Sequence, residues 1–126
     1  MSSKRHALLF GLNYHRTPKA RLRGCINDID NMERLLRTPH YNFGVIRKHP
    51  DTAPNPRTTR KAIIEELEAL ALASVQQNLE AVWIHYSGHG CSVRDNNRDE
   101  RDRMDECLVP SDYNTGGLVR DDDIKR

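Results

Sequence analysis

Candidate strands alternate with segments of helical periodicity along the first two thirds of the chain. The strand candidates cover residues 6–14, 45–48 and 81–84, each short enough for a strand within a sheet. A segment with helical spacing of its apolar residues separates each candidate from the next. Strand, helix, strand, helix, strand is the order of a parallel sheet covered by helices, so the pattern predicts an α/β fold.

Each predicted helix has a candidate cap. Asn27 or Asp28 is suited to begin the first helix, which runs to about Arg37. Thr58 or Thr59 is suited to begin the second, which runs to about Ser74. The apolar positions give each helix one buried face. These faces are Ile29, Met32, Leu35 and Leu36 in the first helix, and Ile63, Ile64, Leu67, Leu70 and Ala71 in the second.

The third strand breaks into Ser87-Gly88-His89-Gly90, a sequence that favours neither strand nor helix. Glycines on both sides leave the backbone free and the imidazole uncrowded. Sites in parallel sheets form at the carboxyl ends of the strands, and the segment with Asp28 follows another such end. The pattern predicts that His89 is a general base at this edge. The alternative is a turn with an incidental histidine.

Composition indicates one globular domain, because the chain has 126 residues, of which 37% are hydrophobic and 30% charged. Neither a signal peptide nor a membrane span is predicted, so the expectation is an intracellular protein without a membrane partner. Residues 1–61 carry 13 basic and 4 acidic residues, a net +9, and residues 62–126 carry 7 and 14, a net −7. The basic residues are scattered among few aromatics, so no nucleic-acid partner is predicted.

The three cysteines, Cys25, Cys91 and Cys107, cannot all pair with one another. Their spacing matches no zinc finger or ribbon. Free thiols in a reducing compartment are therefore predicted. A metal set of His85, His89 and Cys91 is disfavoured, because the glycines interrupt the strand that would align the two histidines.

The segment His85-Tyr86-Ser87-Gly88-His89-Gly90 resembles the histidine motif of the metacaspases, the caspase-like cysteine peptidases of plants, fungi, protists and bacteria. Four further segments resemble this family in the same order, at residues 7–14, 22–28, 105–113 and 119–124. The resemblance covers nearly the whole chain. It implies a caspase-like three-layer sandwich with a mostly parallel sheet flanked by helices, of which residues 1–126 are the N-terminal portion, with an acidic loop at 94–106.

The resemblance assigns His89 as the catalytic histidine and the backbone N–H of Gly90 as a donor to the oxyanion. The family's nucleophilic cysteine lies on a later strand, in an Asp-Cys-Cys-His-Ser-Gly-like motif that residues 1–126 do not contain. These residues alone are therefore expected to be inactive. Cys25 is the best substitute for the thiol, since Cys107 is predicted to be core and Cys91 to point away from His89.

The resemblance also implies a pocket for a basic substrate residue, because metacaspases cut after Arg or Lys. Asp28 and Ser87 match pocket positions of the family, and Cys25 matches a position where some members carry a second cysteine near the active site. A recessed carboxylate selects a cation by pairing with it. The alternatives are a plain helix cap for Asp28 and a packing residue at the helix start for Cys25.

The acidic residues between positions 95 and 123 suggest calcium, which prefers oxygen ligands. The resemblance implies the ligands Asp105, Asp121 and Asp122. One alternative is a solvated loop neutralised by its interleaved arginines. Another is an EF-hand loop over residues 95–106, which Glu100 disfavours at the position that requires glycine. Arg103 and Met104 depart from the Gly and Tyr usual in the family.

The sequence thus predicts a calcium-dependent cysteine endopeptidase domain that cleaves after Arg or Lys, often including itself, with Ca²⁺ and no organic cofactor. The expected partners are protein or peptide substrates and the remainder of the catalytic domain, including its p10-like part. The expected location is cytoplasmic. The alternative is a non-catalytic caspase-fold module that responds to calcium or acts as a scaffold, if Arg126 is the natural terminus.

Overall fold

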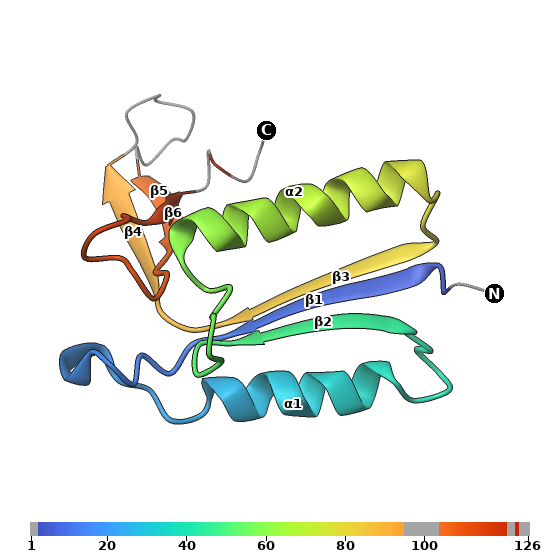
Figure 1. Ribbon diagram of the computed structural model, residues 1–126, viewed down its shortest axis with the longest axis horizontal. Helices are drawn as coiled ribbons and strands as arrows, with labels where there is room; N and C mark the ends of the chain where they lie inside the picture. The colour runs from blue at the N-terminus through green and yellow to red at the C-terminus, as the bar shows by residue number, and fades with distance from the viewer. Residues whose placement is uncertain (1–2, 95–103, 121–122, 124–126) are drawn as a thin grey trace.

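The chain folds as a parallel three-stranded sheet between two helices, in a computed structural model that describes residues 3–94, 104–120 and 123. The strands β1 (Arg5–Gly11), β2 (Val45–Pro50) and β3 (Ala81–Ser87) lie in the order β2-β1-β3. α1 (Cys25–Leu36) covers one face of the sheet and α2 (Arg60–Gln76) the other (Figure 1). These three layers confirm the predicted α/β fold.

β1 is the central strand, because its side chains from Ala7 to Phe10 are all apolar and buried. Successive side chains of a strand point to opposite faces of the sheet. Leu8 and Phe10 therefore pack with Ile63 of α2, whereas Ala7 and Leu9 pack with Ile29 and Leu36 of α1. Burying both faces of one strand joins the two helices into a single core.

β3 differs from the buried strand that the sequence predicts. It lies at one edge of the described sheet, and Val82, Trp83 and Ile84 are 45%, 36% and 54% exposed. An apolar run predicts that both faces of a strand are covered. It does not show which segments of the protein cover them. Only β1 pairs with β3 among the residues that the structure describes.

The two helices differ in how closely they follow their predicted starts. The Thr59 side chain caps α2 by accepting a hydrogen bond from the Ala62 N–H at 3.2 Å, as predicted. α1 begins earlier than predicted, at Cys25, and its cap Gly24 makes no side-chain bond. The Asn13 side chain instead accepts a hydrogen bond from the Cys25 N–H at 3.0 Å. A residue remote in sequence therefore caps α1 in place of Asn27 or Asp28.

Two positions of the predicted apolar faces lie outside the core. Leu35 is 44% exposed, and Ala71 is exposed as well. The remaining positions pack against the sheet, with Ile29, Leu36 and Ile63 fully buried. The helical period therefore located the buried faces but overestimated their width.

A second, antiparallel sheet follows β3 and packs beside the start of α2 (Figure 1). It consists of β4 (Gly90–Arg94), β5 (Met104–Leu108) and β6 (Val119–Arg120). The predicted acidic loop at 94–106 is thus shortened at both ends by strand. Val119 is fully buried in the cluster that contains Ile63, and the Arg60 side chain bonds Leu118 and Asp123. No helix in the described part of the chain is long and apolar enough to cross a membrane.

Acid is expected to destabilise the protein, because Glu66 and His49 form a buried pair between α2 and β2 at 2.8 Å. Burial opposes ionisation of Glu66, but hydrogen bonds from Arg47 and His49 hold its pKa below the ordinary 4.5. Burial lowers the pKa of His49 below 6.5. Both groups bind protons more readily in the unfolded chain. The free energy of unfolding therefore falls as the pH drops below 6.5 for His49, and falls further below 4.5 for Glu66.

Urea unfolding at about pH 7, 5.5 and 4 measures this dependence. Glu66→Gln is the matched control, because it keeps an acceptor oxygen and removes the charge. We expect this variant to have a smaller acid dependence than the parent. An identical dependence in the two proteins would contradict the assignment to Glu66.

Candidate active site

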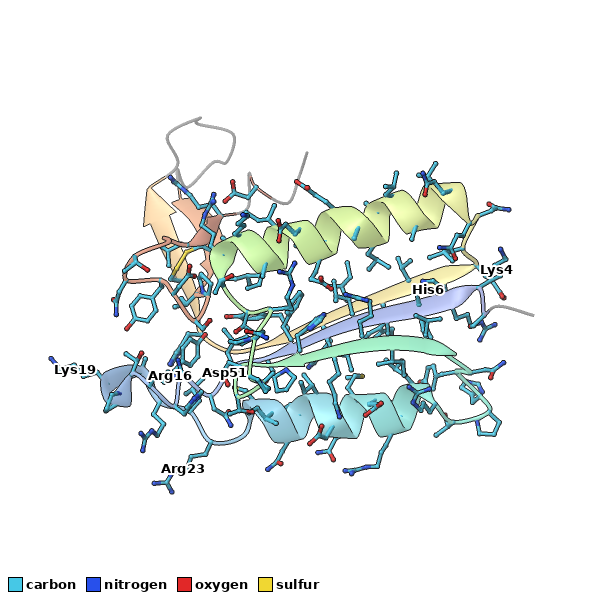
Figure 2. The ribbon with its side chains drawn as sticks, in the orientation of Figure 1. Lys4, His6, Arg16, Lys19, Arg23 and Asp51 are labelled. Carbon is cyan, nitrogen blue, oxygen red and sulfur yellow. A yellow bond between two sulfur atoms is a disulfide. The ribbon has the colours of Figure 1, made fainter. Side chains whose placement is uncertain are left out.

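His89 lies in the link between β3 and β4, at the carboxyl edge of the parallel sheet. The loop after β1 reaches the same edge and contains the short 3₁₀ helix η1 (Pro18–Ala20). Figure 2 shows Arg16, Lys19, Arg23 and Asp51 at this edge, and Lys4 and His6 at the opposite one. The parallel topology therefore brings together segments that are far apart in the sequence.

The imidazole of His89 has a defined orientation. Its Nε2 lies 2.6 Å from the carbonyl oxygen of Ala20. A carbonyl oxygen only accepts hydrogen bonds, so Nε2 carries the hydrogen. Among the described residues, no hydrogen bond to the other ring nitrogen, Nδ1, is seen. No residue-type signal in the sequence marks Ala20, because its backbone rather than its side chain makes the contact.

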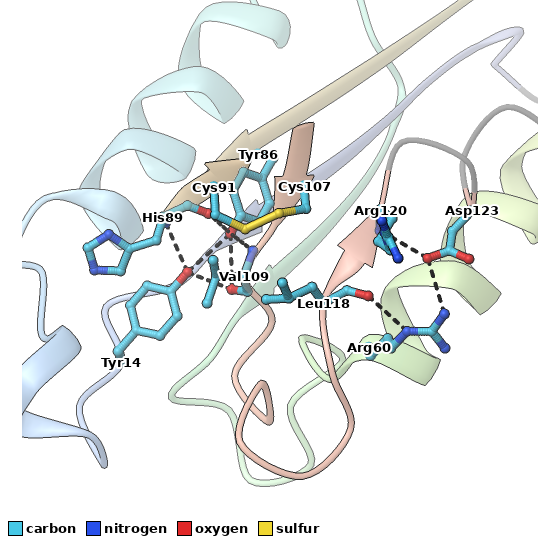
Figure 3. Close-up of a disulfide and its surroundings, with 10 residues drawn as sticks. All are labelled: Tyr14, Arg60, Tyr86, His89, Cys91, Cys107, Val109, Leu118, Arg120 and Asp123. Carbon is cyan, nitrogen blue, oxygen red and sulfur yellow. Dashed lines mark hydrogen bonds and ion pairs between the residues drawn. A yellow bond between two sulfur atoms is a disulfide. The ribbon is translucent and has the colours of Figure 1, made fainter. Parts of the chain in front are cut away.

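The phenols of Tyr14, which is buried, and Tyr86, which is partly buried, hold the backbone of this histidine (Figure 3). The His89 N–H donates to Tyr14 Oη at 2.9 Å, and Tyr86 Oη donates to the His89 carbonyl at 2.8 Å. The Tyr14 ring lies beside the imidazole, with centroids 4.8 Å apart. Burial raises the pKa of both phenols, so both keep their hydrogens at neutral pH.

Gly88 is required at its position by the closeness of these phenols. A β-carbon there would lie 2.7 Å from Tyr86 Oη and 2.9 Å from Tyr14 Oη, closer than such atoms approach. Gly90, the second flanking glycine, is exposed and pairs with Leu108. The Val109 N–H bonds the His89 carbonyl at 3.1 Å, which makes Gly90 and Leu108 a pair that does not exchange hydrogen bonds. The N–H of Gly90 therefore points away from β5.

Asp28 and Ser87 meet beside this edge, although 59 residues separate them in the sequence. Ser87 Oγ donates to Asp28 Oδ2 at 2.6 Å, and Asp28 is exposed. Both line a depression of about 340 Å³ between α1 and β3, together with Asn31, Met32, Leu35, His85 and Tyr86. An exposed carboxylate beside a partly apolar depression is suited to bind the head and stem of a basic side chain.

Cys25 is placed differently from these two residues. It is the first residue of α1, it is 7% exposed, and it does not line the depression. Its position fits the packing alternative of the sequence analysis better than the pocket assignment. The thiol lies in the interior near Tyr14 and Tyr86, where it contributes to raising the pKa of both phenols after the larger effect of burial.

The predicted calcium ligands lie largely outside the described residues. Asp105 pairs with Val93 through the β4–β5 ladder, and its side chain is outside the description. Asp121 and Asp122 are outside it entirely. Within residues 3–94, 104–120 and 123, no three His, Cys, Asp or Glu side chains gather closely enough to hold a metal ion.

The prediction of three free thiols is wrong for two of them. Cys91 and Cys107 form a disulfide between β4 and β5, with Cα atoms 5.1 Å apart, and Cys25 is the free cysteine (Figure 3). The antiparallel register places these two cysteines directly opposite each other. Spacing along the chain does not reveal that register, because the residues between them include part of the acidic loop.

Reduction of the disulfide is expected to lower the free energy of unfolding by about 3 kcal/mol, the usual contribution of a link that closes a loop of about 15 residues. Urea unfolding with and without a dithiol reductant measures this change. The double variant Cys91→Ser/Cys107→Ser is the control, since it should match the reduced protein and not respond to reductant. Equal stability of the parent in both conditions would contradict the prediction.

Comparison with known proteins identifies the family of this chain. Residues 5–126 match the family model of the metacaspase, peptidase C14 domain. Metacaspase III c of Phaeodactylum tricornutum is 35% identical over 95% of this chain and 36% of its own length. Metacaspase-1B of Aspergillus oryzae is 38% identical over 98% of this chain and 29% of its own length. Metacaspase-1A of Neurospora crassa is 39% identical over 98% of this chain and 27% of its own length.

The chain spans about a third of the length of the curated relatives that it matches. The match to the family model nevertheless covers almost all of its residues, including His89 and the segments that surround it. The chain belongs to the metacaspase family of cysteine peptidases.

Proposed function

We propose that this chain is the histidine-bearing part of a calcium-dependent cysteine endopeptidase that cleaves after Arg or Lys. The observation that carries the proposal is the orientation of His89. Its Nε2 is bonded to the Ala20 carbonyl at 2.6 Å, so Nδ1 is the free nitrogen at the carboxyl edge of the sheet. An oriented imidazole with one free nitrogen is the base that a thiol nucleophile needs.

The nucleophilic cysteine in this proposal belongs to a segment outside residues 1–126. Its sulfur attacks the scissile carbonyl, and His89 Nδ1 takes the thiol proton. The N–H of Gly90 stabilises the oxyanion that forms. His89 then gives the proton to the leaving amine, and water hydrolyses the remaining thioester.

In this proposal the segment that carries the nucleophile joins the sheet at β3. Among the described residues only β1 pairs with this strand, and Val82, Trp83 and Ile84 are 36–54% exposed. Such an edge is a template for a further strand. The remainder of the catalytic domain, including the p10-like part, is accordingly the proposed partner of this edge.

Asp28 is the proposed recognition group for the basic substrate residue. Its carboxylate is exposed, and Ser87 holds one of its oxygens at 2.6 Å. A guanidinium or ammonium group is matched by a carboxylate that is fixed in this way.

Asp105, Asp121 and Asp122 are the proposed calcium ligands. The chain leaves β6 at Arg120, which pairs with Cys107, and Asp105 lies two residues before Cys107 on the same strand β5. This register supports a site shared by the two segments, and carboxylate oxygens suit calcium. The bound ion would neutralise the acidic segment near the histidine loop. A cytoplasmic location stays a prediction.

The proposal is tested with the full-length protein and a fluorogenic peptide that ends in Arg, with and without millimolar calcium. We expect cleavage of Arg- and Lys-ended peptides with calcium, and none of a matched Asp-ended peptide. Absence of cleavage, with calcium still raising the melting temperature, would instead favour the non-catalytic calcium-responsive module.

A further inference from the structure

We propose that Tyr14 and Tyr86 are positioning residues that clamp the His89 loop, and that Asp51 holds Tyr14 in place for this purpose. We call the two tyrosines the phenol pair. The inference rests on the proposed function for its catalytic consequence, but the clamp itself is a feature of the described structure.

Every backbone polar group of His89 and Val109 is bonded within this arrangement (Figure 3). Tyr14 Oη accepts the His89 N–H at 2.9 Å and donates to the Val109 carbonyl at 2.7 Å. Tyr86 Oη donates to the His89 carbonyl at 2.8 Å and accepts the Val109 N–H at 3.3 Å. A phenol has one hydrogen to donate, so this assignment uses both hydrogens of the pair.

The phenol pair lies against a segment whose glycines give the backbone conformational freedom. Gly88 and Gly90 flank His89, and glycine loses more conformational freedom on folding than any other residue. Without fixed partners the imidazole would sample many positions. The phenols lie 3.1 Å from each other and within contact of Gly88, so they restrict the loop at the residue next to His89.

Asp51 fixes the backbone of Tyr14. Its side chain is only 2% exposed, and its Oδ2 accepts the Tyr14 N–H at 2.8 Å. Tyr14 has a φ of 56°, a conformation that residues other than glycine rarely adopt and that persists only when the surroundings determine it. The Asp51 N–H in turn bonds the Gly11 carbonyl at 3.0 Å, which ties the carboxylate to the end of β1.

The arrangement joins four separate segments around the backbone of one histidine. Asp51 follows β2, Tyr14 follows β1, Tyr86 lies in β3, and Val109 follows β5. A displacement of about 1 Å in a catalytic group lowers a rate by about 10²-fold. Loss of one phenol oxygen should therefore lower the rate of the chemical step more than it lowers substrate binding.

The test compares Tyr14→Phe, Tyr86→Phe and the double variant in the full-length enzyme, with an Arg-ended peptide. We expect each single variant to lower kcat about tenfold or more and to change KM by less than about twofold. The double variant should lose less than the product of the two single effects, because both oxygens hold one loop. Tyr41→Phe is the matched control, since it removes a phenol at the opposite edge of the sheet.

A second readout does not depend on activity. Amide hydrogen exchange at His89 should accelerate at least about tenfold in Tyr14→Phe and remain unchanged in Tyr41→Phe. Unchanged kcat and unchanged exchange in Tyr14→Phe would overturn the clamp. A parent enzyme without activity would overturn the proposed function, and the exchange measurement would still decide the clamp.

Asp51 is tested by its conservative variant. Asp51→Asn keeps an acceptor oxygen for the Tyr14 N–H, so it should retain kcat within about threefold, whereas Asp51→Ala should lose as much kcat as Tyr14→Phe. Equal losses in the two Asp51 variants would overturn the role of that hydrogen bond and show that charge or packing is what matters.

Discussion

Replacement of His89 by alanine in the full-length enzyme is expected to lower kcat for an Arg-ended peptide by at least about 10³-fold. The physical reason is that the thiol then lacks the base that removes its proton, and the leaving amine lacks its acid. In the proposed mechanism Nδ1 of His89 performs both transfers, because Nε2 is held by the Ala20 carbonyl at 2.6 Å. Steady-state cleavage with saturating calcium measures the loss.

His40→Ala is the control for this substitution, because His40 is exposed in the loop between α1 and β2 at the opposite edge of the sheet. Its activity should equal that of the parent. The melting temperature of both variants should stay close to the parent value, which separates lost chemistry from lost folding. Turnover that survives His89→Ala would contradict the role of the histidine.

Replacement of Asp28 by alanine is expected to lower kcat/KM for Arg- and Lys-ended peptides by roughly 10–10²-fold. This magnitude corresponds to the roughly 1.5–3 kcal/mol that a hydrogen bond to a charged group contributes. The substrate cation would enter the depression between α1 and β3 without a carboxylate to pair with it. Cleavage of peptides with a neutral residue at the cleavage position should be affected far less. The measurement is therefore the ratio of kcat/KM for basic peptides to kcat/KM for neutral peptides.

Asp30→Ala is the matched control for the charge change. Asp30 lies two residues further along α1, and its carboxylate is paired with Lys48 at 2.7 Å rather than directed to Ser87. It should preserve the preference for basic peptides. An Asp28 variant that keeps this preference would show that another group selects the cation.

The order of strands and helices could be predicted because it follows from local patterns. The apolar residues of β1 and the helical spacing in α2 each reflect burial in the element itself, and Thr59 caps its helix through a residue three positions away. The exposure of β3 and the disulfide depend on what lies beside a segment in space. The start of α1 depends on Asn13, which is remote in sequence and so leaves no local signal.

The residues of the candidate site also differ in whether the local sequence indicates them. His89 was evident because glycines flank it, and Asp28 because it follows a predicted strand. Ala20, Tyr14 and Asp51 were not found, since Ala20 acts through its carbonyl and the other two act through bonds to distant backbone groups. A signal for Tyr14 did exist, because the polar Asn13-Tyr14 pair ends an apolar run directly before the loop that supplies Ala20.

The Cys91–Cys107 link encloses a segment that contains four arginines, Arg94, Arg98, Arg101 and Arg103. A peptidase that cleaves after basic residues, as proposed for this chain, would have a choice of peptide bonds there. Hydrolysis of any one of them leaves the two products joined through sulfur, with the histidine on one piece and residues 107–126 on the other. Nicked molecules would migrate as intact protein in denaturing electrophoresis without reductant and as two fragments with it. Autolysis within residues 92–106, if the protein cleaves itself there, would therefore be visible only on reducing gels.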